Sequence, residues 1–329
     1  MCAFAVILEG PGCSSIGVGA FSENGPFRPN GQVLLRNEYS WNREANMLYL
    51  DTPIGVAKDN LVFLQRWFLK FPQYGNSSLF ITGESYAGHY VPQLAKLIIE
   101  LNQQRKIINL KGIALGNPLL EFTTDYNSRA EYFWSHGLIS DSTYNLFTSV
   151  CNYSRYVREY YRDSLSVLCS RVMSLVNRES SRFVNKYDVT LDVCIPSVLS
   201  QSKIIAPQRN SERIDVCVED ETVSYLNRRD VQKALHARLV GVRRWDVCSN
   251  ILDYDMLDLE IPTISILGSL IKEEIPVLIY RSVDGLKYTA IFSHLPPLGA
   301  SHEAPFSQPE RSFVLFKSFL DGRPLPQEF

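Results

Sequence analysis

Ser85 is the residue whose neighbours most clearly favour nucleophilic chemistry. Gly83 precedes it and Gly88 follows it, in the order Gly-x-Ser-x-x-Gly. A strand pattern at 79–82 leads into this segment, and apolar residues recur at helical spacing over 91–98. A tight turn between a strand and a helix exposes a serine hydroxyl at the end of a sheet, where the helix amino terminus stabilises developing negative charge. The segment therefore predicts a nucleophile elbow with Ser85 at its tip.

The elements that must hold this serine alternate between strands and helices. Apolar runs typical of buried strands lie at 4–8, 47–50, 79–82, 110–115, 263–267 and 277–280. Apolar residues recur at helical spacing over 59–70, 91–98 and 312–320. Such alternation predicts an α/β fold, in which a mostly parallel sheet is covered by helices on both faces.

The middle of the chain differs from the rest in its residue pattern. At about 125–239, aromatic and charged residues mix at helical spacing, and four of the seven cysteines fall in this stretch. We interpret the stretch as a helical, disulfide-containing insertion or cap. The expected organisation is therefore one domain over 1–329 that carries this insertion.

The overall composition excludes two classes of partner. The chain has 329 residues, 45% of them hydrophobic, which is enough for a sizeable core. A formal net charge of -2 argues against a general nucleic-acid binder, because such proteins show a basic excess. No apolar run approaches the roughly 18 residues of a membrane-spanning helix. We therefore expect neither a nucleic acid nor a membrane as a partner.

The seven cysteines bear on the cellular compartment. None forms a C-x-x-C pair or a His/Cys cluster with zinc spacing, so no structural metal is expected. Their number alone fits both a disulfide framework with one cysteine left over and free cysteines in a cytosolic protein. Two N-glycosylation acceptors, at Asn76 and Asn152, favour the secretory pathway. Residues 1–8 lack a basic segment and a cleavage site, so they do not form a signal peptide, and the start of the chain looks truncated.

A resemblance to a known family rests on five blocks. Residues 83–92 read Gly-Glu-Ser-Tyr-Ala-Gly-His-Tyr-Val-Pro and resemble the active-serine signature of serine carboxypeptidases at every position. The other blocks resemble that family in the same order along the chain and lie at 10–15, 21–26, 116–118 and 299–305. The similarity covers almost the whole chain and fits the plant branch best. It implies an α/β-hydrolase fold and hydrolysis of C-terminal peptide bonds through an acyl-enzyme.

The resemblance also implies the roles of the catalytic groups. Ser85 matches the nucleophile, and His302 matches the general base that later acts as the acid. The backbone N–H groups of Gly10 and Tyr86 match the oxyanion hole. The remaining histidines are expected to be structural: His89, His136, His236 and His294.

Glu23 and Glu84 match a pair of carboxyl groups that the family uses to bind the C-terminal carboxylate of its substrate. Two carboxyl groups held together cannot both ionise at low cost, so one pKa rises and that group supplies a hydrogen-bond donor at acidic pH. The resemblance therefore implies an exopeptidase that acts in an acidic compartment. It also implies three disulfides, with Cys2 left unpaired: Cys13–Cys248, Cys151–Cys169 and Cys194–Cys217.

The sequence departs from the family at three places. Residues 8–12 read Leu-Glu-Gly-Pro-Gly where the family has Asn-Gly-Gly-Pro-Gly, whose asparagine helps to bind the terminal carboxylate. The loop that the family has after 55–56 is missing. After Tyr280 the family continues Ser-Gly-Asp-x-Asp, with the first Asp as the triad acid, whereas residues 281–285 read Arg-Ser-Val-Asp-Gly. Asp284 is the nearest candidate acid, and the pattern indicates lost segments.

These observations together predict a serine-type carboxypeptidase of the secretory pathway, extracellular or vacuolar, whose activity is impaired by loss of the triad Asp segment. Its partner is the C-terminus of a peptide or protein, and no cofactor or metal is implied. One alternative is an acyltransferase of the same architecture, although the setting of Glu84 favours a peptidase. The other alternative is a catalytically inactive binding protein or fragment. The oligomeric state is open, with a homodimer as one option.

Overall fold

The computed structural model describes residues 3–8, 10, 12–51, 56–105, 107–189, 191–195, 214–237, 241, 244–249, 251, 258–280 and 301–324. The chain forms two compact units. The sheet unit comprises Met1–Pro118, Cys194–Leu252 and Ser265–Phe329, and the helical unit comprises Leu119–Val193 and Asp253–Ile264. The insertion predicted at about 125–239 thus overlaps the helical unit only as far as Val193, and the residues after it belong to the sheet unit.

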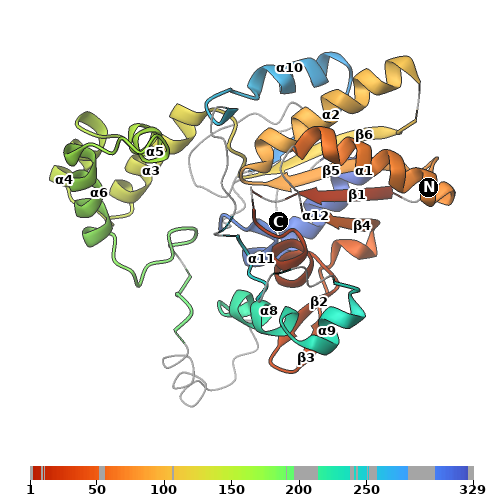
Figure 1. Cartoon of the computed structure of the whole chain (residues 1–329), viewed down its shortest axis with the longest axis horizontal. Coiled ribbons are helices and arrows are strands. Elements are labelled where there is room, and N and C mark those ends of the chain that lie inside the picture. The colour runs from red at the N-terminus through yellow and green to blue at the C-terminus, as the bar shows by residue number, and fades with distance from the viewer. Residues whose placement is uncertain are drawn as a thin grey trace. The chain divides into compact units, whose positions relative to one another are not determined.

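Within the described residues, a five-stranded sheet forms the centre of the sheet unit (Figure 1). All its neighbouring strands are parallel. The strand order is β4 (Ala45–Leu50), β1 (Ala3–Leu8), β5 (Ser78–Glu84), β6 (Leu110–Gly116) and β7 (Val277–Tyr280). The mostly parallel α/β fold and five of the six predicted strands are therefore confirmed.

Helices cover both faces of this sheet. On one face, Phe80 of β5 packs against Phe319 of α12 (Pro309–Asp321), with ring centroids 5.4 Å apart. Successive side chains of a strand alternate between faces, so the fully buried Ile81 points to the other face. There α2 (Ala87–Gln104) packs against β5 and β6. Figure 1 shows α2 above the strands.

The predicted helices are confirmed as parts of α1 (Val56–Lys70), α2 and α12. The strand predicted at 263–267 is wrong, because these residues lead into α10 (Ile264–Lys272). Alternating Ile and Ser over a short window imitated a strand, whereas the longer segment has helical spacing. Leu267 and Leu270, three residues apart, are both buried, so they lie on the one covered face of the helix. A window of five residues is too short to separate the two periods.

Shorter elements complete the sheet unit. An antiparallel pair of strands, β2 (Phe27–Asn30) and β3 (Val33–Arg36), forms a separate sheet. The remaining short elements are helical: the π-helix η1 (Ile16–Glu23), the 3₁₀ turns η2 (Trp41–Arg43) and η3 (Pro72–Tyr74), and α8 (Val218–Leu226), α9 (Arg229–Ala234) and α11 (Ala304–Ser307). π-helices are rare and occur frequently at functional sites, which draws attention to the end of η1 at Glu23.

The described part of the helical unit contains α3 (Phe122–Ser135), α4 (Asp141–Ser149), α5 (Tyr153–Tyr161) and α6 (Val167–Glu179). Each helix begins with a side chain that accepts hydrogen bonds from free backbone N–H groups. These capping residues are Glu121, Ser140, Asn152 and Ser166. The caps explain why polar residues mark the helix boundaries in a stretch whose apolar periodicity is weak.

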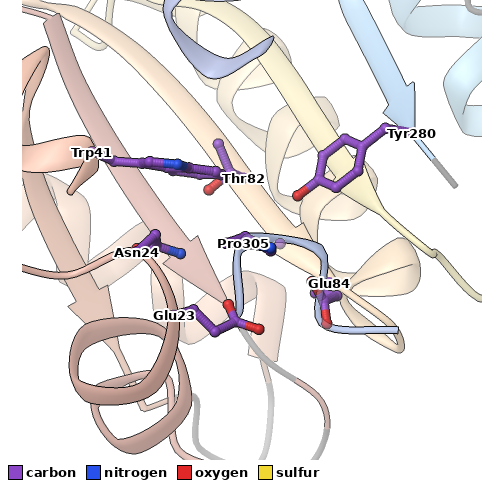
Figure 2. Close-up of a pocket in the computed structure, with 8 residues that line it drawn as sticks. Glu23, Asn24, Trp41, Thr82, Glu84, Tyr280 and Pro305 are labelled. Carbon is purple, nitrogen blue, oxygen red and sulfur yellow. The ribbon is translucent and has the colours of Figure 1, made fainter. Parts of the chain in front are cut away.

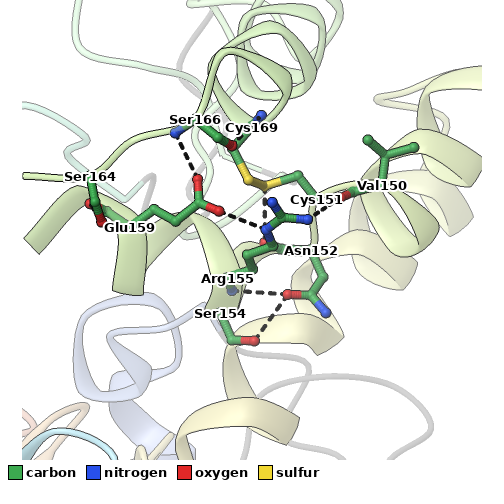
Figure 3. Close-up of polar contacts among 9 residues, drawn as sticks. All are labelled: Val150, Cys151, Asn152, Ser154, Arg155, Glu159, Ser164, Ser166 and Cys169. Carbon is green, nitrogen blue, oxygen red and sulfur yellow. Dashed lines mark hydrogen bonds and ion pairs between the residues drawn. A yellow bond between two sulfur atoms is a disulfide. The ribbon is translucent and has the colours of Figure 1, made fainter. Parts of the chain in front are cut away.

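The carboxylate of Glu159 links α5 to the start of α6 (Figure 3). The side chain of Glu159 accepts from Nε of Arg155 at 2.7 Å and from the backbone N–H of Ser166 at 2.8 Å. Hydrogen bonds from Ser166 and Arg155 lower the pKa of Glu159 to about 2. The Cys151–Cys169 disulfide lies beside this contact and is buried in the core of the unit.

Among the described residues there are three disulfides, and they are the pairs that the family resemblance implies: Cys13–Cys248, Cys151–Cys169 and Cys194–Cys217. The Cα atoms of Cys13 and Cys248 are 3.9 Å apart. This is closer than most disulfides, because the two residues face each other in an antiparallel bridge. The flanking residues carry the hydrogen bonds of that bridge, from Ser14 N–H to the Val247 carbonyl and from Ser249 N–H to the Gly12 carbonyl. Non-hydrogen-bonded pairs of this kind have the shortest Cα separations in antiparallel pairing.

Loss of the Cys13–Cys248 disulfide is expected to destabilise the protein more than loss of Cys194–Cys217. The first closes a loop of 235 residues and the second a loop of 23, so the entropy that each removes from the unfolded chain differs. The chain-entropy relation gives a difference of about 2 kcal/mol. Urea unfolding of the two double Cys→Ser variants measures it. Equal losses of unfolding free energy contradict the prediction.

Candidate active site

Ser85 occupies a strained turn between β5 and α2. β5 ends at Glu84 and α2 begins at Ala87, so two residues make the connection. Ser85 has a φ of 59°, in the left-handed region that L-residues other than glycine seldom adopt. Its backbone N–H donates to the Gly116 carbonyl at 2.9 Å, which fixes the turn against the end of β6. This is the strand–turn–helix geometry that presents a serine hydroxyl at the carboxyl end of a sheet.

The backbone of His302 is anchored at the end of β6. Asn117, which directly follows Gly116, donates through Nδ2 to the carbonyl of His302 at 2.6 Å and to that of Ser301 at 3.3 Å. Consecutive residues at the end of β6 therefore hold the backbones of the serine and histidine segments. The structure brings the two segments together, while the hydrogen bond between their side chains stays a prediction.

A buried network of hydroxyl groups stabilises the turn around His302. The Ser301 hydroxyl lies 2.8 Å from the Ser307 hydroxyl, which also accepts from the Ser301 backbone N–H at 2.7 Å. Both hydroxyls contact the carbonyl of Glu303, at 2.9 and 3.2 Å. Ser301 and Ser307 are buried, so these bonds are shielded from water. They hold the residues on either side of His302 in one conformation.

Gly10 and Tyr86, the residues implied for the oxyanion hole, are neighbours in space. A Cβ atom added to Gly10 would lie 3.7 Å from the Cβ atom of Tyr86. The Tyr86 ring stacks on His89, with centroids 4.7 Å apart, and His89 is buried in α2. The placement of Gly10 beside Tyr86 agrees with the implied site, and the use of their N–H groups by substrate stays a prediction.

Glu23 and Glu84 line one pocket, although 61 positions separate them in sequence (Figure 2). Glu23 ends η1 and Glu84 ends β5, and they are 3% and 5% exposed. The backbone carbonyl of Glu23 accepts from Nη2 of Arg28 at 2.9 Å and from Nδ2 of Asn37 at 3.0 Å. These bonds fix the end of the π-helix and so the position of Glu23. The structure thus places Glu23 in the same pocket as Glu84, the residue directly before Ser85. Proton sharing between the two carboxyl groups stays a prediction.

Sequence reasoning missed three polar residues of this pocket region. Asn24 and Trp41 line the pocket beside Glu23, and Tyr280 lines it from the end of β7. Asn24 follows Glu23 directly within the block at 21–26, so that block was the one available signal. Nothing in the local pattern marks Trp41 or Tyr280 as more than core aromatics.

Tyr49 extends the pocket region behind Asn24. Its hydroxyl donates to Oδ1 of Asn24 at 3.0 Å and lies 3.3 Å from Oδ1 of Asn42. Burial, with a smaller contribution from the negative charge of Glu23, raises the pKa of Tyr49 far above its usual range. Tyr49 therefore remains a neutral hydrogen-bond donor at every physiological pH.

The other predicted sites divide into described and undescribed residues. Asp284 lies outside the described residues, as does Cys2. Asn76 is exposed in the turn after η3, and Asn152 caps α5 in the helical unit through Oδ1. Among the described residues, Cys194, Cys217 and Asp220 form one group with metal-ligand spacing, but the two cysteines are joined in a disulfide and offer no thiolate. No helix in the described part of the chain has the length and hydropathy to cross a membrane.

Glu303, next to His302, has an unusual titration. Burial, together with the negative charge of Glu219 on α8, raises its pKa from the ordinary value of 4.5 to about 7. The folded protein therefore holds this proton more tightly than the unfolded chain does. Between pH 4.5 and 7 the folded state keeps the proton while the unfolded state loses it, so stability falls as the pH rises.

We expect this group alone to reduce the free energy of unfolding by on the order of 3 kcal/mol between pH 4.5 and 7. The Glu303→Gln variant removes the titration and should flatten the fall. The exposed Glu310→Gln variant serves as the matched control and should keep it. Urea unfolding at several pH values measures the slopes, and equal slopes in all three proteins contradict the prediction.

The parallel sheet, the strained serine turn after β5 and the histidine segment at the end of β6 define the class of the protein as an α/β-hydrolase. The profile of the family described as serine carboxypeptidase matches residues 8–57 and 55–285. The chain therefore belongs to the serine carboxypeptidase family.

Individual relatives agree with this assignment. The chain is 61% identical to serine carboxypeptidase-like 45 of Arabidopsis thaliana, over 97% of this chain and 82% of that protein. It is 58% identical to serine carboxypeptidase-like 46 of the same plant, over the same shares. The alignment with the first extends over 379 residues, whereas this chain has 329, so that relative contains segments that this chain lacks.

The fold is also similar to a solved structure, Kex1(delta)p, a prohormone-processing carboxypeptidase from Saccharomyces cerevisiae. The TM-score is 0.70, and the match covers 98% of this chain and 83% of that one at 21% identity. At this identity the likeness shows the fold, and it confirms the α/β-hydrolase architecture expected from the sequence.

Proposed function

We propose that this chain is a serine-type carboxypeptidase that cleaves the C-terminal peptide bond of a peptide or protein through an acyl-enzyme on Ser85. The observation that carries the proposal is the adjacency of two features. Ser85 lies in the strained turn after β5, and the residue before it, Glu84, shares a buried pocket with Glu23. A nucleophile next to a pocket for a terminal carboxylate attacks the last peptide bond and no other.

The reaction then proceeds in two halves. Oγ of Ser85 attacks the carbonyl carbon while His302 accepts the hydroxyl proton, and the N–H groups of Gly10 and Tyr86 stabilise the oxyanion. The carbon–nitrogen bond breaks, and His302 gives its proton to the departing amino group. Water then attacks the acyl-enzyme, loses its proton to His302, and releases the shortened peptide as Ser85 regains a proton.

The two carboxyl groups set the pH range of binding. Below the raised pKa of the pair, one carboxyl group is neutral and donates a hydrogen bond to the substrate carboxylate. Above it, both are ionised and repel that carboxylate. The proposed enzyme therefore binds substrate best at acidic pH, as suits a vacuolar or extracellular location. The three disulfides support an oxidising compartment, and glycans at Asn76 and Asn152 are part of the same proposal.

Turnover is proposed to be slow, because residues 281–285 lack the family's Ser-Gly-Asp-x-Asp block. The triad acid holds the histidine in the correct tautomer and stabilises its cation. The same departure favours a second candidate function, a binding protein that retains the carboxylate pocket but does not complete the reaction. Asp284 is the nearest candidate for the missing acid.

A fluorophosphonate probe tests the proposed function at the nucleophile. An activated Ser85 reacts covalently, and Ser85→Ala is the matched control that does not. Release of the C-terminal residue from an N-blocked dipeptide at acidic pH then tests the peptidase reaction, and ester formation with an added alcohol tests acyl transfer. Labelling with peptide hydrolysis supports the carboxypeptidase, and binding of the dipeptide without labelling supports the second candidate.

A further inference from the structure

Asn24 presents a hydrogen-bond donor to the Glu23–Glu84 pocket. Asn24 is 3% exposed and lines the pocket. Its Oδ1 accepts the Tyr49 hydroxyl at 3.0 Å, which orients the amide so that Nδ2 points the other way. Figure 2 shows that nitrogen directed toward the centre of the lining residues. The hydrogen bond of this amide within the described part of the chain runs through Oδ1, so Nδ2 is the donor that it offers to a ligand in the pocket.

Trp41 adds a second donor in the same lining. Its Nε1 is buried and has no hydrogen-bond partner among the described residues. Stacking on Phe316, with ring centroids 4.1 Å apart and planes at 9°, fixes the indole. Buried donors without partners are rare in native proteins and require an explanation, because each forfeits the hydrogen bond that water supplied in the unfolded chain.

The chemistry of the lining selects a carboxylate as the ligand. Two oriented N–H donors match the two oxygens of a carboxylate, which accepts hydrogen bonds and donates none. None of the described residues that line the pocket is an arginine or a lysine, so recognition has to come from neutral donors. A C-terminal carboxamide offers one oxygen and brings an NH₂ group, which would face the N–H donors with a donor of its own.

We propose that Asn24 is a specificity-determining residue that donates a hydrogen bond from Nδ2 to the C-terminal carboxylate of the substrate, with Tyr49 as the positioning residue of its amide. This inference rests on the proposed function, because it places the substrate's terminus beside Glu84. It also supplies a side-chain amide donor, which residues 8–12 of this chain do not contain.

Binding in a Ser85→Ala background tests the assignment without turnover. Calorimetry at acidic pH compares an N-benzoylated dipeptide that has a free C-terminal carboxylate with the same dipeptide as its C-terminal amide. Asn24→Ala is expected to weaken binding of the acid by roughly 10- to 100-fold, the range for a hydrogen bond to a charged group, and to leave the amide unchanged. Tyr49→Phe should give a smaller loss in the same direction, because the amide then loses its fixed orientation.

Asn42→Ala is the matched control, because Asn42 lies near the same tyrosine hydroxyl but is exposed and does not line the pocket. It should bind both peptides as the parent does. Equal weakening of acid and amide by Asn24→Ala would mean that Asn24 only packs the pocket, and it would overturn the proposal. No effect on either peptide, or failure of the parent to prefer the acid, overturns it as well.

Labelling of the unmutated protein with the fluorophosphonate separates the two proposals. If Ser85 labels and the preference for the acid does not depend on Asn24, the carboxypeptidase assignment stands and the role of Asn24 falls. If Ser85 does not label but Asn24→Ala removes the preference for the acid, the carboxylate site stands and the acyl-enzyme falls.

Discussion

Replacing residues 281–285 with the family-length segment that contains Ser-Gly-Asp-x-Asp is expected to raise turnover of an N-blocked dipeptide by on the order of 10⁴. The triad acid receives a hydrogen bond from the base histidine, fixes its tautomer and stabilises the imidazolium that forms during attack. The expected gain is the factor by which a serine protease slows when this function alone is lost. Because acid and base act on the chemical step, the gain should appear in kcat while KM changes little.

Asp284 provides the control for this comparison. If the present chain lacks a working acid, Asp284→Asn leaves its low activity unchanged. If instead the restored and present chains turn over equally, Asp284 already acts as the acid, and Asp284→Asn should abolish activity. Steady-state release of the C-terminal residue, with His302→Ala as the zero reference, distinguishes the two results. Equal turnover by the restored and the present chains would contradict the prediction that the segment is needed.

The sheet was predictable because its strands are local signals. Strands buried on both faces read as continuous apolar runs, and 79–82 and 277–280 come close to this pattern. α2 was predictable for the complementary reason, since Val91, Leu94 and Ile98 form one buried stripe. The prediction of a strand at 263–267 failed because alternation over five residues fits the period of a strand as well as that of a helix. The next turn of the helix, with its buried Leu270, decided the matter.

The site was predictable only where its groups lie in recognisable blocks. Ser85 and Glu84 are adjacent, and Glu23 falls in a block of its own. The roles of Asn24 and Tyr49 arise from a contact between the residue that follows η1 and a residue of β4, 25 positions further along the chain. No periodicity records which amide a tyrosine hydroxyl orients, because that choice depends on tertiary packing. The titration of Glu303 is equally non-local, since it depends on Glu219 in α8.

Ser85 and His302 are expected to behave as one catalytic unit. In the restored protein, Ser85→Ala and His302→Ala should each lower kcat by about 10⁶, and the double variant should lose no more than either. The reason is that the hydroxyl is a weak nucleophile without the base, and the base has nothing to activate without the hydroxyl. Additive losses would contradict a shared role and would assign His302 to folding instead.

The same substitutions should cost far less in the chain as it stands. In a serine protease, removing the acid alone lowers kcat by about 3 × 10⁴, and removing the serine lowers it by roughly 2 × 10⁶. A factor of about 10² therefore remains to be lost once the acid is gone. Ser85→Ala in the present chain is therefore expected to reduce peptide hydrolysis by about 10², against about 10⁶ after restoration. The Asn24→Ala variant supplies the contrast, since it acts on binding and should raise KM with kcat unchanged. A loss of 10⁶ for Ser85→Ala in the present chain would show that its triad is already complete, with an acid drawn from residues 281–300.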